Sequence, residues 1–188
     1  MIGILRTFID FWPFLSSRDI EPRGNLAEAD VIFAQSFGFR RIGSRIVPGP
    51  SNEVMTRKLV WEIFKMYHHP MILQWEVADA LPEKPIDLWE IKKHRKEGKY
   101  LDSYEVAFQT VEIMKKHGWK KIILIAQPWH MWRKIKIFEK MGIEVIIPPE
   151  LWLIPFDKKS EQWWIRNWFF WIIREIPTRL ISKKRKWI

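Results

Sequence analysis

The sequence contains no cysteine among its 188 residues. This absence excludes a disulfide framework, a cysteine nucleophile and the common zinc sites that are built on thiolates. Histidine does not replace cysteine as a metal ligand, because His68, His69 and His94 do not have the spacing of a metal-binding motif. We therefore expect no metal. A P-loop and a serine nucleophile elbow are also missing from the sequence, so no motif of this kind identifies a reaction.

The sequence also lacks an uninterrupted apolar run of the roughly 18 residues that a transmembrane helix needs. Its first residues, MIGILRTFIDFWPFL, carry Arg6 and Asp10 within the apolar stretch and have no cleavage site of small residues. The segment therefore does not resemble a secretory signal. We expect residues 1–27 to pack on or beside the main domain, and the protein to be cytoplasmic or peripheral to a membrane.

Basic residues outnumber acidic ones by 32 to 22, and the excess is concentrated near the C-terminus. Residues 160–188 contain seven Lys or Arg residues and two acids, which gives half of the total net charge of +10. Because the rest of the chain is more balanced, nucleic acid binding by the whole domain is poorly supported. Binding of DNA or RNA through the basic residues 183–186 is the weakest functional hypothesis.

Short apolar runs alternate with amphipathic helical segments, which is the pattern of a parallel α/β sheet. We expect one three-layer, Rossmann-like α/β domain over residues 28–175, with a mostly parallel sheet. The expected strands are residues 30–35, 71–77, 122–126 and 143–147. Between the second and third strands, residues 81–98 have the composition of an insertion over the sheet edge, with a charged helix near residues 87–97. Residues 176–188 are expected to form a basic tail.

Polar side chains end three of the expected strands, where ligands bind in parallel α/β sheets. Gln35, Gln74 and Gln127 occupy these positions, and Glu76 shares a face with Gln74 by alternation. Around one crevice, the three amides would suit a polar, uncharged edge such as that of a sugar or a base. The alternative is that they hydrogen-bond the loop backbones.

A second group of candidates lies at the starts of helices. His130 and Arg133 are three residues apart, so on a helix they would share a face, and they could present an imidazole and a guanidinium to one anion. The alternative is that His130 caps the turn and Arg133 pairs with Glu105 or Glu76. Asp102 and Glu105 fit a capping box, with an active-site role for Glu105 as the rival interpretation.

A further helix is expected to begin at Ser51. Ser51 and Asn52 follow a loop rich in Gly and Pro, and a helix N-terminus of this kind can receive an anion. Capping of the helix is the favoured role of Ser51.

Residues 100–148 carry a resemblance to a known family. WHMWR at residues 129–133 is similar to the aromatic-His-Met-x-Arg signature of the YdcF/SanA/ElyC family, and SYEVA at residues 103–107 resembles its Thr-x-Glu-Asn-Ala segment. The chain departs from the family where Gly-rich turns are expected after the first two strands, which here read QSFG at residues 35–38 and QWE at residues 74–76.

The resemblance implies a Rossmann-like protein that binds or acts on a phosphorylated or nucleotide-type small molecule, in cell-envelope or lipid-carrier metabolism. It also implies acid or base roles for His130 and Glu105, and charge stabilisation by Arg133. The remaining expected ligand-binding residues are Gln35, Ser36, Gly38, Ser51, Asn52, Gln74, Glu76, Ser103 and Gln127. The missing glycines favour a second hypothesis, a non-enzymatic protein with a degenerate site that is peripheral to a membrane.

The C-terminal segment supports that second hypothesis. Six of the thirteen tryptophans lie between Trp152 and Trp187. We expect Ser160 to cap a helix that is apolar almost all round over residues 163–173. Flanking tryptophans and a basic tail are typical of an interfacial membrane anchor that contacts anionic lipid. The alternative is that this helix packs on the sheet as its last covering helix.

Overall fold

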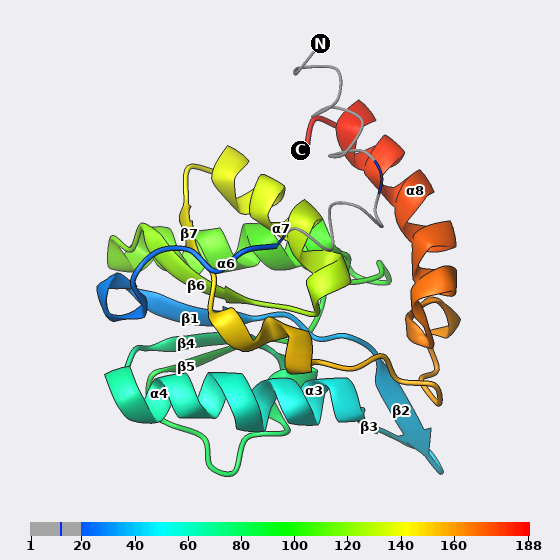
Figure 1. Ribbon diagram of the computed structural model, residues 1–188, viewed down its shortest axis with the longest axis horizontal. Coiled ribbons are helices and arrows are strands. Elements are labelled where there is room, and N and C mark those ends of the chain that lie inside the picture. Colours follow the sequence, from blue (N-terminus) through cyan, green and yellow to red (C-terminus); the bar gives the residue numbers. More distant parts are fainter. Residues whose placement is uncertain (1–11, 13–19) are drawn as a thin grey trace.

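The computed structural model describes residue 12 and residues 20–188. Most of the N-terminal segment, for which packing beside the domain is expected, lies outside these residues. The described chain forms a five-stranded sheet in the order β5-β4-β1-β6-β7, with every neighbouring pair parallel (Figure 1). Its strands are β1 (Val31–Ala34), β4 (Met71–Gln74), β5 (Leu88–Ile91), β6 (Lys121–Ile125) and β7 (Glu144–Ile146). The three-layer, Rossmann-like α/β fold expected from the sequence is confirmed.

Helices cover both faces of the sheet (Figure 1). One face carries the continuous run of α3 (Pro50–Met55), η2 (Thr56–Val60) and α4 (Trp61–Tyr67), and the other carries α6 (Ser103–His117) and α7 (Pro128–Lys140). All four residues of β1 are buried, because this central strand has a helix layer on each side. The short helices are η1 (Leu26–Glu28), α5 (Trp75–Ala78), η3 (Pro149–Leu153) and η4 (Trp163–Ile165).

The strand order creates a switch point beside the central strand. From β1 the chain builds outward through β4 and β5, and then crosses back to add β6 and β7 on the other side. The carboxyl ends of β1 and β6 are therefore the place where open α/β sheets of this type bind ligands. The last helix, α8 (Trp168–Lys184), runs beside this edge of the sheet (Figure 1).

The structure corrects two predictions between Met71 and Gly98. The second strand ends at Gln74 rather than Val77, because the chain turns there into the short helix α5. The charged helix near residues 87–97 is also wrong, since that segment contains the edge strand β5, which pairs with β4. Pairing of this segment with the neighbouring strand β4 outweighs its polar composition, and it buries Ile91.

The C-terminal helix begins later and ends later than predicted. Asn167 caps α8 by accepting a hydrogen bond from Phe170 N at 3.0 Å. Ser160, the expected cap, instead donates to the carbonyl of Phe39 at 3.1 Å. Because α8 continues to Lys184, most of the segment expected to be a tail is helical.

An antiparallel hairpin interrupts the connection between β1 and α3. It consists of β2 (Phe39–Ile42) and β3 (Arg45–Pro48), which the sequence pattern did not predict. Gly38 precedes it with φ = 82°, a conformation that L residues rarely adopt. A Cβ atom at this position would collide with Cδ1 of Ile165 and lie 2.7 Å from Oγ of Ser160. The close approach holds the turn after β1 against η4.

Replacing this glycine tests that packing. Gly38→Ala should lower the free energy of unfolding by about 3 kcal/mol, because backbone strain and steric overlap act together. Gly43→Ala is the matched control, since Gly43 also has a positive φ, of 60°, but open space around it; it should lose only about 1 kcal/mol. Urea denaturation of both variants measures the difference, and equal losses would contradict the close contact.

Candidate functional site

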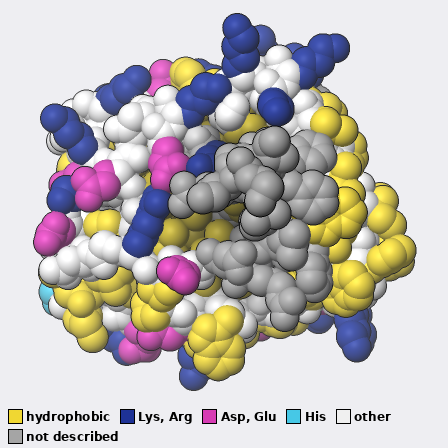
Figure 2. All heavy atoms as spheres, turned by 45° about the horizontal axis from the view of Figure 1, so that its top comes forward, with side chains coloured by type: hydrophobic (Ala, Val, Ile, Leu, Met, Phe, Trp, Pro, Cys, Tyr) yellow, Lys and Arg dark blue, Asp and Glu magenta, His cyan; other side chains and the backbone are white. Residues whose placement is uncertain are grey.

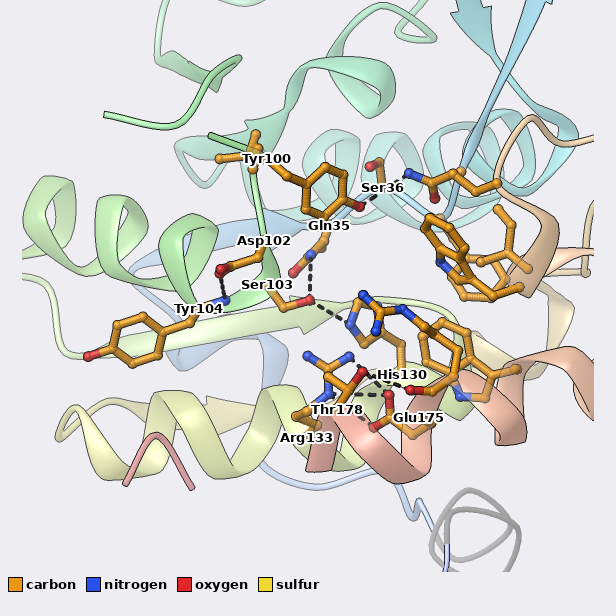
Figure 3. Close-up of a pocket in the computed structure, with 18 of the residues that line it drawn as sticks. Gln35, Ser36, Tyr100, Asp102, Ser103, Tyr104, His130, Arg133, Glu175 and Thr178 are labelled. Carbon is orange, nitrogen blue, oxygen red and sulfur yellow. Dashed lines mark hydrogen bonds and ion pairs between the residues drawn. The ribbon is translucent and has the colours of Figure 1, made fainter. Parts of the chain in front are cut away.

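A cavity of about 110 Å³ lies at the switch point, enclosed by the ends of β1 and β4, the start of α6, and the helices α7 and α8 (Figure 3). It brings together residues that are far apart in the sequence. Seven of the predicted site residues line it: Gln35, Ser36, Gly38, Gln74, Ser103, His130 and Arg133. Sequence reasoning missed the contribution of α8, which supplies Trp171, Arg174 and Glu175 to the wall.

A short chain of hydrogen bonds crosses the cavity from β1 to α7 (Figure 3). The Nε2 atom of Gln35 donates to Oγ of Ser103 at 3.4 Å, and Oγ of Ser103 lies 3.0 Å from Nε2 of His130. Ser103 holds this position because α6 begins there. Asp102 caps the helix, as predicted, by accepting from the backbone N–H groups of Tyr104 and Glu105 at 2.9 Å each.

His130 is neutral in this environment. Burial lowers its pKa well below the ordinary value of 6.5, and the positive charges of Arg133 and Lys134 lower it further. The ring packs edge-on against Trp171, with 5.2 Å between centroids. A serine–histidine pair of the hydrolase type needs a carboxylate on the second ring nitrogen, and Nδ1 of His130 has no partner among the described residues. Within the described residues, the Ser103–His130 pair therefore lacks the third member of a hydrolase triad.

Arg133 is held by a carboxylate of the protein itself. Its Nε and Nη2 atoms donate to Oε1 and Oε2 of Glu175, each at 3.0 Å, and both side chains are buried (Figure 3). Arg179 shares the same carboxylate through Nε at 3.1 Å. Arg133 therefore pairs with neither Glu105 nor Glu76. The sequence does contain a signal for this partner, because Glu175 is the only acid between Trp163 and the C-terminus.

Lys134 is a second buried cation that sequence reasoning missed. Its Nζ atom donates to the carbonyl of Ser103 at 2.7 Å, which ties α7 to the first turn of α6. Burial lowers the pKa of Lys134 well below its ordinary value of 10.5, and Arg133 adds to this effect. No motif in the sequence indicates that Lys134 lies beside the cavity.

Glu105, a candidate acid or base, does not line the cavity. Its carboxylate accepts from Nε of Arg95 at 2.7 Å instead of completing a capping box. The hydrogen bonds from Arg95 lower the pKa of Glu105 to about 2. A carboxylate that stays ionised in this way has no proton to donate near neutral pH.

Three further candidates bond to the backbone rather than facing the cavity. Asn52 brackets the turn after β1, accepting from Phe37 N at 2.8 Å and donating to the carbonyl of Gly38 at 2.6 Å. Gln127 caps α7 by accepting from Trp129 N at 2.7 Å. Ser51 is not the cap that was predicted, because α3 begins at Pro50, after Gly49, and its Oγ atom donates to the carbonyl of Pro155.

Three residues that line the cavity each carry a buried side-chain atom with no hydrogen-bond partner within the described chain. These atoms are Oε1 of Gln35, Oε1 of Gln74 and Nδ1 of His130. More than nine in ten buried polar groups in folded proteins are paired, because an unpaired one costs about 1–3 kcal/mol. Three such atoms in residues that line one cavity make it the place where a polar partner would recover the most free energy.

Comparison of the chain with protein-family models, characterised proteins and solved structures found no match. The resemblance to the YdcF/SanA/ElyC family therefore stays a prediction, and the function has to be argued from the cavity. Within residue 12 and residues 20–188, no group of three His, Asp or Glu side chains is placed to hold a metal ion.

Glu76 lies behind the cavity, next to Ser36 and Gln74. Burial raises the pKa of this carboxyl group from 4.5 to about 7, and the Ser36 and Gln74 side chains oppose only part of that shift. Between pH 4.5 and 7 the folded chain thus keeps a proton that the unfolded chain releases. The contribution of Glu76 to stability must therefore fall as the pH rises through this window and stay lower above it, by about 3 kcal/mol in all.

Glu76→Gln should remove this loss. The free energy of unfolding, measured by urea denaturation at a series of pH values, should exceed that of the unaltered chain by an amount that grows as the pH rises toward 7. Comparing the two chains isolates Glu76, because His130 contributes equally to both. The exposed Glu62→Gln is the control and should follow the unaltered chain at every pH. Parallel curves for Glu76→Gln and the unaltered chain would show that burial does not hold a proton on Glu76.

Proposed function

We propose that this chain is a binding protein for a small molecule that carries a phosphorylated sugar-type or nucleotide-type group, and that it does not catalyse a reaction. The observation that supports this most strongly is that three residues lining one cavity, Gln35, Gln74 and His130, each carry a buried atom without a hydrogen-bond partner in the described chain. Their position at the switch point is where α/β proteins of this topology bind such ligands.

The hydrogen-bonding groups suit a ligand with hydroxyl or amino groups. The two amide oxygens accept hydrogen bonds, which the hydroxyls of a sugar or the exocyclic amine of a base can donate. Nδ1 of the neutral His130 ring accepts or donates, depending on which nitrogen carries the hydrogen. A ligand that satisfies all three atoms recovers the free energy that their burial costs.

The charges around the cavity favour an anionic substituent. Arg133 and Arg179 share the carboxylate of Glu175 beside the cavity. Arg174 also lines the cavity, is exposed, and lies over the ring of Trp164 at 5.5 Å. Its guanidinium can receive a phosphate at the mouth, whereas Arg133 is already engaged by Glu175.

The volume limits how much of the ligand enters. Pockets for whole drug-sized ligands have volumes of about 300–1,000 Å³, and this cavity has about 110 Å³. One ring or one phosphate group fits, and the remainder of a nucleotide would lie outside. The cavity would therefore recognise only a terminal polar group of the ligand.

The surroundings of the candidate catalytic residues support binding rather than catalysis. Glu105 lies off the cavity and is ionised by Arg95, His130 is neutral without a carboxylate partner, and Arg133 is occupied. Among the residues that the structure describes, no general base with a pKa near neutrality faces Ser103. This agrees with the hypothesis of a degenerate, non-enzymatic site that the missing glycines suggested.

The test uses thermal shift with a panel of nucleotides, sugar phosphates, S-adenosylmethionine, free sugars and inorganic phosphate. At least one phosphorylated compound should raise the melting temperature, because a ligand that binds only the folded state stabilises it. Gln35→Met with Gln74→Met should abolish that rise while changing the stability of the unliganded protein little, because removing two unpaired amide oxygens offsets the loss of the hydrogen bonds made by the two amide nitrogens.

Gln127→Met is the matched control. It loses the cap of α7 and should cost about 1 kcal/mol of stability, but it should keep the full response to the ligand because Gln127 does not line the cavity. If no compound shifts the unaltered chain, or if the cavity variant responds as strongly as the unaltered chain, the proposed binding site is wrong.

A further inference from the structure

The polar and apolar faces of α8 are reversed relative to a helix on the surface of a globular protein. Its buried residues are Trp171, Glu175, Arg179 and Ser182, which follow one another at helical spacing, and three of the four are polar. A surface helix normally turns its apolar stripe inward and its charged face to water. Here the ion cluster around Glu175 occupies the inward side.

The side of α8 that faces away from the domain is apolar. We name as the outer face the residues Phe169, Phe170, Ile173, Leu180 and Ile181, which are 36–54% exposed. Trp163 and Trp168 extend the same apolar surface at the start of the helix, where they are also exposed. Hydrophobic side chains gather on this side of the molecule in the space-filling view (Figure 2). An exposed apolar surface of this continuity indicates an interaction site.

Exposed cations surround the outer face. Arg166 lies just before the start of α8, and Lys183, Lys184, Arg185 and Lys186 lie at its C-terminal end. From Lys158 to the C-terminus, the only exposed acid is Glu161. The partner that fits an apolar face with a basic border is an anionic lipid surface, since each cation near such a surface adds to the attraction.

The same charges argue against a second copy of the chain as the occupant. A two-fold dimer through this face would place each patch against its own copy, so the basic borders of the two protomers would face each other and repel. Exposed tryptophans at the end of an apolar helix face are also typical of a membrane–water interface.

We propose that α8 lies in the plane of an anionic bilayer surface, with its outer face inserted at the boundary between headgroups and acyl chains. Within the described residues no helix is long and apolar enough to cross a bilayer, so the contact is peripheral. The opposite side of α8 lines the cavity through Trp171, Arg174 and Glu175. Docking therefore brings the cavity within one helix diameter of the lipid, about 10 Å.

Flotation of the full chain with lipid vesicles tests this proposal independently of any cavity ligand. The protein should float with vesicles of equal parts phosphatidylcholine and phosphatidylglycerol, and much less with pure phosphatidylcholine. Raised salt should weaken the binding, because part of the attraction is electrostatic. Phe169→Ser with Ile173→Ser should weaken partitioning at least about tenfold, and so should Lys183→Glu with Lys184→Glu.

Two matched controls distinguish binding through the outer face of α8 from nonspecific adsorption of the protein to vesicles. Ile42→Ser with Ile86→Ser removes two exposed apolar residues elsewhere, and Lys115→Glu with Lys116→Glu reverses two lysines in the last turn of α6, as Lys183 and Lys184 lie in the last turn of α8. Both should float like the unaltered chain. All four altered positions on α8 are exposed, so unchanged melting temperatures should show that folding is retained.

Failure of the unaltered chain to float with anionic vesicles at low salt would overturn the proposal. Equal flotation of the α8 variants and their controls would do the same. Sedimentation velocity provides a third outcome: a dimer that Phe169→Ser with Ile173→Ser dissociates, without any vesicle binding, would show that a second copy covers this face.

Discussion

The buried carboxylate of Glu175 determines how the carboxyl edge of this sheet is arranged. It accepts hydrogen bonds from Arg133 on α7 and from Arg179 on its own helix, and all three side chains are buried. Removing one partner from such a cluster costs about 3–5 kcal/mol, because the remaining charge is left without compensation. This constraint fixes the rotation of α8 about its axis.

A comparison of free energies explains why α8 does not turn its apolar side toward the domain. Burying the half-exposed outer face would stabilise the helix by about 1 kcal/mol for each side chain. The same rotation would expose Trp171, at about 3 kcal/mol, and leave Arg133 buried without a carboxylate, at about 3–5 kcal/mol; together these losses are somewhat larger than the gain of about 5 kcal/mol from five side chains. The ion cluster therefore turns the outer face toward the surroundings and places Glu175, Trp171 and Arg174 on the wall of the cavity.

The sequence predicts the centre of this fold better than its edges. The apolar runs of β1 and β6, the Asp102 cap and the left-handed Gly118 that ends α6 all follow from local pattern. β5 does not, because its segment is polar enough to suggest a helix and becomes a strand only by pairing with β4. Glu76 alternates with Gln74 in a strand, but the chain turns into α5 at Trp75 and takes Glu76 behind the cavity.

In the candidate site, too, some residues could be placed from the sequence and others could not. The strand-end rule locates Gln35, Gln74 and His130 in one cavity, since their positions depend on the parallel topology alone, and the family resemblance adds Ser103. The state of Arg133 depends on a carboxylate that lies 42 residues away in the sequence. Local spacing contains no information about that contact, so the sequence suggests Glu105 or Glu76 as possible partners of Arg133, and the structure pairs it with Glu175.

Hydrogen exchange measured along α8 tests the role of Glu175 most directly. In the unaltered chain, amides of residues 172–184 should be protected well above those of the connecting loops. In Glu175→Gln they should exchange much faster, while β1 and β6 keep their protection, because the helix has lost the contact that holds it to α7. Equal exchange of α8 in the two chains would show that packing alone positions the helix, and would contradict the central role of the buried ion cluster.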